Sequence, residues 1–158
     1  MEQPDVRIVR LEPMYVASAL GFGPNPEELA WNQLLAWIKT SGLAVAHPKM
    51  RFFGFNNPSP SVGSPNYGYE QWVTVPIGTQ GAAGITIKNF NGGLYAVSRC
   101  KLGAITAAWK ALVLWRETGP YRQAHHQWLE ECLGSPLTEI GNLETDFDLY
   151  LPVYQPQA

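Results

Sequence analysis

The segment Leu34–Trp37 (Leu-Leu-Ala-Trp) returns as Leu112–Trp115 (Leu-Val-Leu-Trp), 78 residues further along the chain. In each copy another tryptophan, Trp31 or Trp109, stands six residues before the closing one. Apolar residues around both segments recur at the spacing of an amphipathic helix. The sequence therefore predicts two copies of one unit, each built around such a helix.

Matches on both sides of these helices keep the same order. Tyr15–Ser18 aligns with Tyr95–Ser98 at an offset of 80, and Tyr69–Val73 aligns with Phe147–Leu151 at 78. Two unrelated helices followed by generic strands are the alternative interpretation. The near-constant offset favours duplication within a single domain 1–158, with repeat one at about 5–77 and repeat two at about 84–154.

Each repeat is predicted to run strand, helix, strand, strand. Pro24–Glu28 provides a start for the first helix, with Asn25 as the cap, and Gly42 a stop. A Pro-, Gly- and Ser-rich loop at 56–68 is expected to be exposed. The expected strands are 6–22, 52–55, 69–75, 85–100 (interrupted at 91–93), 128–133 and 147–153, and the second helix is 104–117.

These elements predict an α+β fold with antiparallel sheets, in which the two repeats are related by a pseudo-two-fold. The helices would cover one face of the sheets. The other face would form a central ligand cleft where the copies meet.

Composition excludes several classes of protein. The chain has 158 residues, 46% of them hydrophobic and only 15% charged, which is enough to bury a core. A net charge of −2 without a basic stretch argues against nucleic acid, and the apolar run 102–115 is too short to span a membrane. Two cysteines without a C-x-x-C pair argue against a disulfide framework and predict a cytoplasmic location. The adjacent His125 and His126 would face opposite ways on a strand, so no metal site is expected, and no cofactor either.

Strand alternation selects candidate side chains for the cleft. Glu70 and Trp72 share one face of their strand, and at an offset of 78 they match Asp148 and Tyr150. Leu129 and Leu133 suit the core, so Glu130 is expected to face the cleft. Glu131 is then expected near a sheet edge or a helix end.

A carboxylate among aromatic rings has a specific chemical use. Ring faces attract a cation, and the carboxylate supplies the compensating charge. Solvated sheet positions are the alternative interpretation for Glu70 and Glu130. For Trp31, Trp37, Trp109 and Trp115, which lie on the predicted helices, core packing is expected.

The chain resembles the GyrI-like small-molecule-binding domain, which is also the effector-binding domain of AraC- and MerR-type multidrug regulators. The resemblance covers almost the whole chain, and the family fold is two strand-helix-strand-strand (SHS2) repeats. It rests on the motifs Trp72–Pro76, Gly92–Val97, Leu114–Trp115, Leu129–Gly134 and Asp148–Val153.

This resemblance implies a central pocket for hydrophobic, often cationic compounds in a stand-alone form of the domain. The family's ligand-binding glutamate falls on Glu130, and pocket positions fall on Glu70 and Tyr95. Cys132 replaces the usual aromatic, and Glu131 replaces a usual apolar residue. The residues expected to bind ligand are Glu130, Glu70, Trp72, Tyr95, Trp128, Tyr150 and Phe52.

Binding of a small hydrophobic or cationic molecule is the first hypothesis. The second is a hydrolase of cyclopropane-bearing alkylating toxins, with Glu130 or Glu70 as general base and Tyr95 as proton donor. A mechanism from Cys132 with His125 or His126 is weaker.

The third hypothesis is a protein partner, gyrase or a regulator. It would need an exposed apolar patch on the loop 56–68, where the sequence offers only Val62 and Tyr67.

Overall fold

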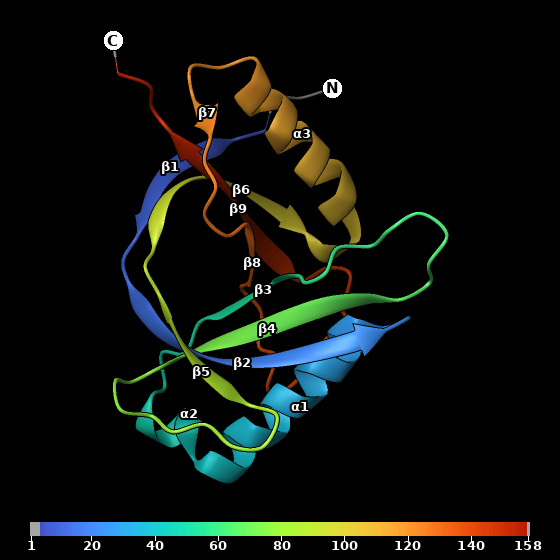
Figure 1. The fold of residues 1–158 in the computed structure, drawn as a ribbon, viewed down its shortest axis with the longest axis vertical. Coiled ribbons are helices and arrows are strands. Elements are labelled where there is room, and N and C mark those ends of the chain that lie inside the picture. Colours follow the sequence, from blue (N-terminus) through green and yellow to red (C-terminus); the bar gives the residue numbers. More distant parts are fainter. Residues whose placement is uncertain (1–3, 158) are drawn as a thin grey trace. The chain divides into compact units, whose positions relative to one another are not determined.

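The computed structural model describes residues 4–157, and the chain divides into two compact units (Figure 1). Unit I is Met14–Phe90. Unit II combines residues 4–13 with residues 91–157. Each unit includes the predicted order of a strand, a helix and two further strands, and it has additional strands besides these.

Unit I is an antiparallel sheet with one long helix. The sheet order is β3-β4-β2-β5, and α1 lies along β2 and β4 (Figure 1). Its elements are β2 (Met14–Gly23), α1 (Pro26–Ser41), α2 (Leu43–Ala46), β3 (Phe52–Asn56), β4 (Tyr67–Val75) and β5 (Thr86–Phe90). The loop between β3 and β4 is exposed over residues 57–66, as predicted.

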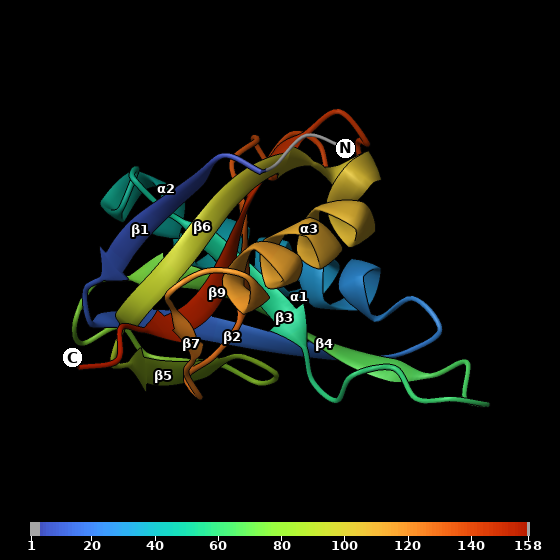
Figure 2. The same ribbon diagram turned by 90° about the horizontal axis from the view of Figure 1, so that it is seen from above.

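Unit II repeats this plan. The sheet order is β8-β9-β6-β1, the short β7 also pairs with β9, and α3 runs beside β9 and β6 (Figure 2). Its elements are β1 (Val6–Leu11), β6 (Gly93–Lys101), the 3-10 turn η1 (Leu102–Ala104), α3 (Ile105–Glu117), β7 (Arg122–Gln123), β8 (Leu129–Cys132) and β9 (Asp146–Tyr154). The α+β class and the antiparallel pairing are therefore confirmed.

The ends of α1 follow the local sequence. Pro26 occupies the first turn, where its missing N–H leaves no hydrogen bond unmade, and Gly42 adopts a left-handed conformation with φ of 72° at the carboxyl end. Asn25 is the N-terminal cap residue, but its side chain makes no capping hydrogen bond. Ala30, Leu34 and Ile38 form the buried stripe.

The strand expected at 6–22 is two strands that belong to different units. β1 pairs with β6 in unit II, whereas β2, which follows it after Glu12–Pro13, pairs with β4 and β5 in unit I. The region 85–100 is divided in the same way between β5 and β6. Each repeat therefore opens with a strand that completes the other repeat's unit.

The helix-bearing face of each sheet is fixed by close contacts. A Cβ on Gly21 of β2 would lie 2.9 Å from the backbone nitrogen of Ala30 in α1, so Gly21 and Ala17 face the helix. In unit II, Ala96 packs in one cluster with Leu112 of α3. Ala17 thus corresponds to Ala96, one residue away from the alignment with Val97 that the sequence motif suggested. None of the helices among residues 4–157 is long and apolar enough to cross a membrane.

Candidate ligand-binding site

The residues predicted to bind ligand divide between the two faces of their sheets. Tyr69 is opposite Gly21 and faces α1, so the alternating Glu70 and Trp72 point to the helix-free face. Tyr95 alternates with the helix-facing Ala96 and also points away from its helix. The helix-free residues are Glu70, Trp72, Tyr95 and Tyr150, and the helix-facing ones are Glu130, Trp128 and Phe52.

The prediction that Glu130 shares a face with Glu70 and Tyr150 is wrong. Leu129 is opposite Tyr150 on the helix-free face and is fully buried there. Tyr95 and Val97 are also fully buried on that face. Both faces of the unit II sheet therefore bury apolar side chains. For this reason, the positions of the leucines around Glu130 do not indicate which face of the sheet the helix covers.

Glu130 lies half-buried beside two tryptophan rings on the helix-bearing face of unit II. Trp109 of α3 donates a hydrogen bond from its indole nitrogen to Glu130 Oε2 at 2.7 Å. The rings of Trp109 and Trp128 are tilted by 40° with centroids 5.4 Å apart. Trp128 is 39% exposed, so the Glu130 site, defined here as Glu130, Trp109 and Trp128, combines a carboxylate, two ring faces and access from solvent.

Unit I keeps the ring pair but not the carboxylate. Trp31 of α1 and Phe52 of β3 have centroids 5.6 Å apart at 41°, nearly the geometry of the pair in unit II. The position two residues after Phe52 is Gly54, where a Cβ would overlap the ring of Tyr69. Of these two equivalent positions, only the one in unit II bears an acid.

Glu70 has a different environment, almost completely buried with 2% of its surface exposed. Its carboxylate accepts hydrogen bonds from Trp72 Nε1 (2.6 Å), Lys88 Nζ (2.6 Å), Ser18 Oγ (2.8 Å) and Asn57 Nδ2 (3.0 Å). Burial alone would raise the pKa of Glu70, but these four donors together outweigh it and lower the pKa. Glu70 is therefore an ionised, fully engaged carboxylate and a poor proton acceptor.

Tyr95 is also committed to internal contacts. Its hydroxyl donates to the carbonyl of Gln127, and its ring packs edge-on against His126 and Tyr150, with centroids 4.7 and 5.4 Å away. Burial raises the pKa of Tyr95 well above its ordinary value. The hydroxyl thus stays protonated and donates its hydrogen bond to the Gln127 carbonyl oxygen.

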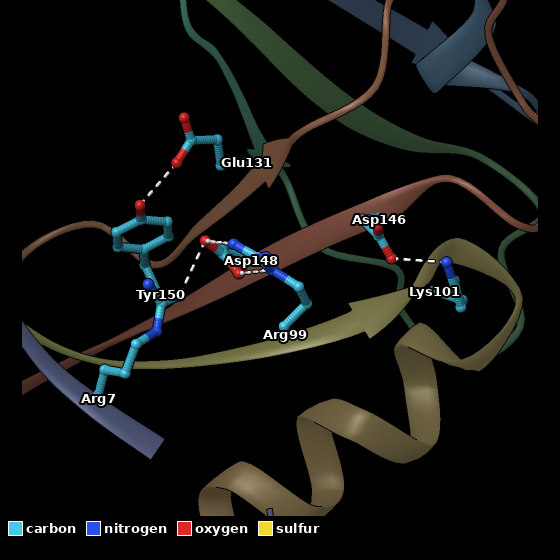
Figure 3. A network of polar contacts seen from close by, with 7 residues as sticks. All are labelled: Arg7, Arg99, Lys101, Glu131, Asp146, Asp148 and Tyr150. Atoms are coloured by element: carbon cyan, nitrogen blue, oxygen red, sulfur yellow. Dashed lines mark hydrogen bonds and ion pairs between the residues drawn. The ribbon is translucent and has the colours of Figure 1, made fainter. Parts of the chain in front are cut away.

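A second polar network occupies the helix-free face of unit II (Figure 3). Asp148 is buried and binds Arg7 at 2.9 Å and Arg99 through two contacts of 3.1 and 3.3 Å. On the neighbouring strand β8, Glu131 is buried and accepts a 2.6 Å hydrogen bond from Tyr150. Glu131 is thus accommodated by a hydroxyl donor from the neighbouring strand β9.

The sequence did not identify three of the residues that define these clusters. Trp109 was assigned to core packing, because helical spacing does not distinguish a ring that fills the core from one that binds a carboxylate. Lys88 and Arg7 come from β5 and β1, whose partner strands lie in the other repeat. The only sign of their role in the sequence was a positively charged residue among apolar ones on each of these strands.

The thiols give little support to a cysteine mechanism. Burial raises the pKa of Cys100 to about 11 and raises that of Cys132, so both are protonated at neutral pH and are weak nucleophiles. Within residues 4–157, no three His, Cys, Asp or Glu side chains are grouped so that they could hold a metal ion.

The comparisons with known proteins identify the family. The model of the integron-associated effector-binding proteins matches residues 7–153. The chain belongs to this family. None of the curated proteins compared with this chain matches it.

Solved structures share the fold at low sequence identity. The C-terminal domain of EcmrR has a TM-score of 0.71 at 13% identity, over 97% of this chain and 99% of that one. A hydrolase from Listeria innocua has 0.69 at 11%, over 98% and 94%. SAV2435 bound to tetraphenylphosphonium has 0.61 at 10%, over 95% and 94%. The resemblance to the GyrI-like effector-binding domain is confirmed.

Proposed function

We propose that this chain binds small aromatic cations at the Glu130 site. The observation that carries the proposal is the half-buried Glu130 carboxylate held by an indole N–H beside the tilted pair Trp109 and Trp128. A cation over a tryptophan face gains about 0.5–2 kcal/mol, more as it is desolvated. The carboxylate supplies the opposite charge in the same place.

The family and one solved structure support a small-molecule role. Members are described as effector-binding proteins, and SAV2435 was solved with an aromatic cation, tetraphenylphosphonium. Cations of this type are bulky, apolar and permanently charged. Those properties match a carboxylate beside one half-buried and one exposed indole.

Hydrolysis has less support, although one similar fold is described as a hydrolase. A hydrolase needs a general base that can accept a proton. Glu70 has a lowered pKa and accepts four hydrogen bonds, and the Tyr95 hydroxyl already donates its hydrogen bond to the Gln127 carbonyl oxygen. A protein-partner role through the loop 56–68 rests on Val62 alone, because Tyr67 donates its hydroxyl to Glu27.

Calorimetry with two matched probes tests the proposal. Methyltriphenylphosphonium carries a positive charge, and triphenylphosphine oxide has a similar shape without one. Glu130→Gln keeps the acceptor oxygen for Trp109 but removes the charge. It should weaken binding of the cation about tenfold and leave the neutral probe nearly unchanged.

The control is Glu139→Gln, which removes the same charge at an exposed position. It should leave both affinities unchanged. Equal losses for the cation and the neutral probe in Glu130→Gln, or no binding of the cation by the wild type, would contradict the proposed function.

A further inference from the structure

The side of α3 that carries Trp109 also carries an arginine. At 3.6 residues per turn, Trp109, Val113 and Arg116 lie on one flank of the helix. All three are half-buried, whereas Leu112 beside them is fully buried and Lys110 is exposed. The Trp109 flank, defined by these three residues, is thus a partly open margin of the unit II core.

Arg116 has an unmade hydrogen bond on this flank. Its Nε atom is buried and has no hydrogen-bond partner among residues 4–157. The carboxylate of the adjacent Glu117 is 4.0 Å from Arg116 Nη2, too far for a hydrogen bond. A buried donor without an acceptor destabilises the folded chain, so an acceptor that reaches Nε would be favoured.

Arg99 shows which acceptor suits the edge of a guanidinium that is formed by Nε and Nη2. It uses Nε and Nη2 together to bind the two oxygens of Asp148. A planar carboxylate fits this pair of donors better than a single oxygen does. The corresponding edge of Arg116 has its Nη2 near Glu117 but its Nε unpaired.

We propose that Arg116 binds a carboxylate of the ligand, at the opposite end of the Trp109 flank from Glu130. With a rise of 1.5 Å per residue, Trp109 and Arg116 are about 10 Å apart along the helix. The ligands are then zwitterionic: an aromatic cation with a carboxylate at roughly that distance from its positive centre. This inference rests on the proposed function and specifies its ligand class.

Rhodamine B and its ethyl ester separate the two charges. Both share one cationic aromatic body, but only rhodamine B carries a free carboxylate. Fluorescence titration of the wild type should give the higher affinity for rhodamine B. Arg116→Met should weaken rhodamine B about tenfold and leave the ester within about twofold, because only the carboxylate uses the guanidinium.

Two further variants test whether a lower affinity for rhodamine B in Arg116→Met has another cause. Lys110→Met removes a positive charge from the exposed side of the same helix and should change neither affinity. Arg116→Lys keeps the positive charge but loses the paired N–H donors of the guanidinium. Its affinity for rhodamine B should therefore lie between those of Arg116→Met and the wild type. Thermal unfolding of Arg116→Met without dye should show no loss of stability, since the variant removes an unpaired buried donor.

The outcomes separate the two proposals. If the wild type binds the ester but Arg116→Met weakens both dyes equally or neither, the role of Arg116 is overturned and binding at Glu130 stands. If the wild type binds neither dye, the ligand class and the proposed function are both overturned.

Discussion

Two glutamates of this chain lie beside tryptophan rings, and their surroundings separate their roles. Glu70 accepts hydrogen bonds from four side chains, one of them the ammonium group of Lys88, and is almost completely buried. Glu130 is half-buried and accepts an indole N–H. The first arrangement stabilises the fold of unit I, and the second places a half-buried carboxylate beside tryptophan rings, as the proposed ligand site requires.

The lowered pKa of Glu70 predicts a pH-dependent stability. Because its folded-state pKa is below the ordinary value of 4.5, the folded carboxylate binds protons less readily than the unfolded one. Its contribution is fully present above pH 4.5 and is lost as the pH falls through the folded-state pKa. Glu70→Gln should lower the free energy of unfolding by about 1–3 kcal/mol at pH 7, and less at pH 3.

Urea unfolding of both proteins between pH 7 and pH 3 measures this difference. Glu28→Gln at an exposed position is the control and should have little effect at any pH. A gap between wild type and Glu70→Gln that stays constant over the whole range would refute the role given to the ionised carboxylate.

Among the elements, the two helices show how one plan gives two different surfaces. α1 and α3 each present a tryptophan to an aromatic residue, Phe52 at the start of β3 or Trp128 just before β8, in nearly the same geometry. The difference arises two residues after each of these aromatics, where Gly54 of β3 corresponds to Glu130 of β8. One side chain therefore distinguishes a core contact from a candidate ligand site.

The close packing of α1 against β2 depends on Gly21. A Cβ there would overlap the carbonyl oxygen of Pro26 and lie 2.9 Å from the nitrogen of Ala30, and both are backbone atoms of the helix. Gly21→Ala should therefore lower the free energy of unfolding by about 2–3 kcal/mol, at the upper end of overpacking effects. Urea unfolding measures the change.

Leu20→Ala serves as the neighbouring control, because Leu20 points away from α1 and is 55% exposed. Its effect should stay below about 1 kcal/mol. An unchanged unfolding midpoint in Gly21→Ala would show that the packing of α1 against β2 does not require a glycine at this position.

On the scale of the whole molecule, the linear repeats and the folded units are not the same pieces of chain. β1 opens repeat one but pairs with β6, and β5 precedes β6 but pairs with β2. Each unit thus takes its edge strand from the other side of a repeat boundary. Gly92, with φ of 75°, lies at one of the two crossings.

This arrangement predicts that neither linear half folds alone. Residues 1–79 contain β1 without β6, and residues 80–158 contain β5 without β2. Each half then leaves one strand unpaired and one sheet edge uncovered. Circular dichroism and proton–nitrogen NMR spectra of the separate halves should show no cooperative fold, and two well-dispersed spectra would contradict the prediction.

Several features could be predicted from the sequence because they depend on local periodicity. The spacing of Trp31, Trp37, Trp109 and Trp115 located both helices, and alternation with the turn residues located β3, β4, β8 and β9 within a few residues. The duplication and the α+β class followed from these patterns. Glu130 was also singled out from the sequence and its family resemblance.

Only the tertiary structure decided which face each candidate occupies and which partners it has. Alternation sorts side chains into two sets, but it cannot tell which set a helix covers when both faces are buried, as Leu129 and Tyr95 show. The pairing of Lys88 with Glu70 and the unpaired Nε of Arg116 depend on contacts between distant segments. Local sequence carries no information about such contacts, because they arise only when strands and helices pack.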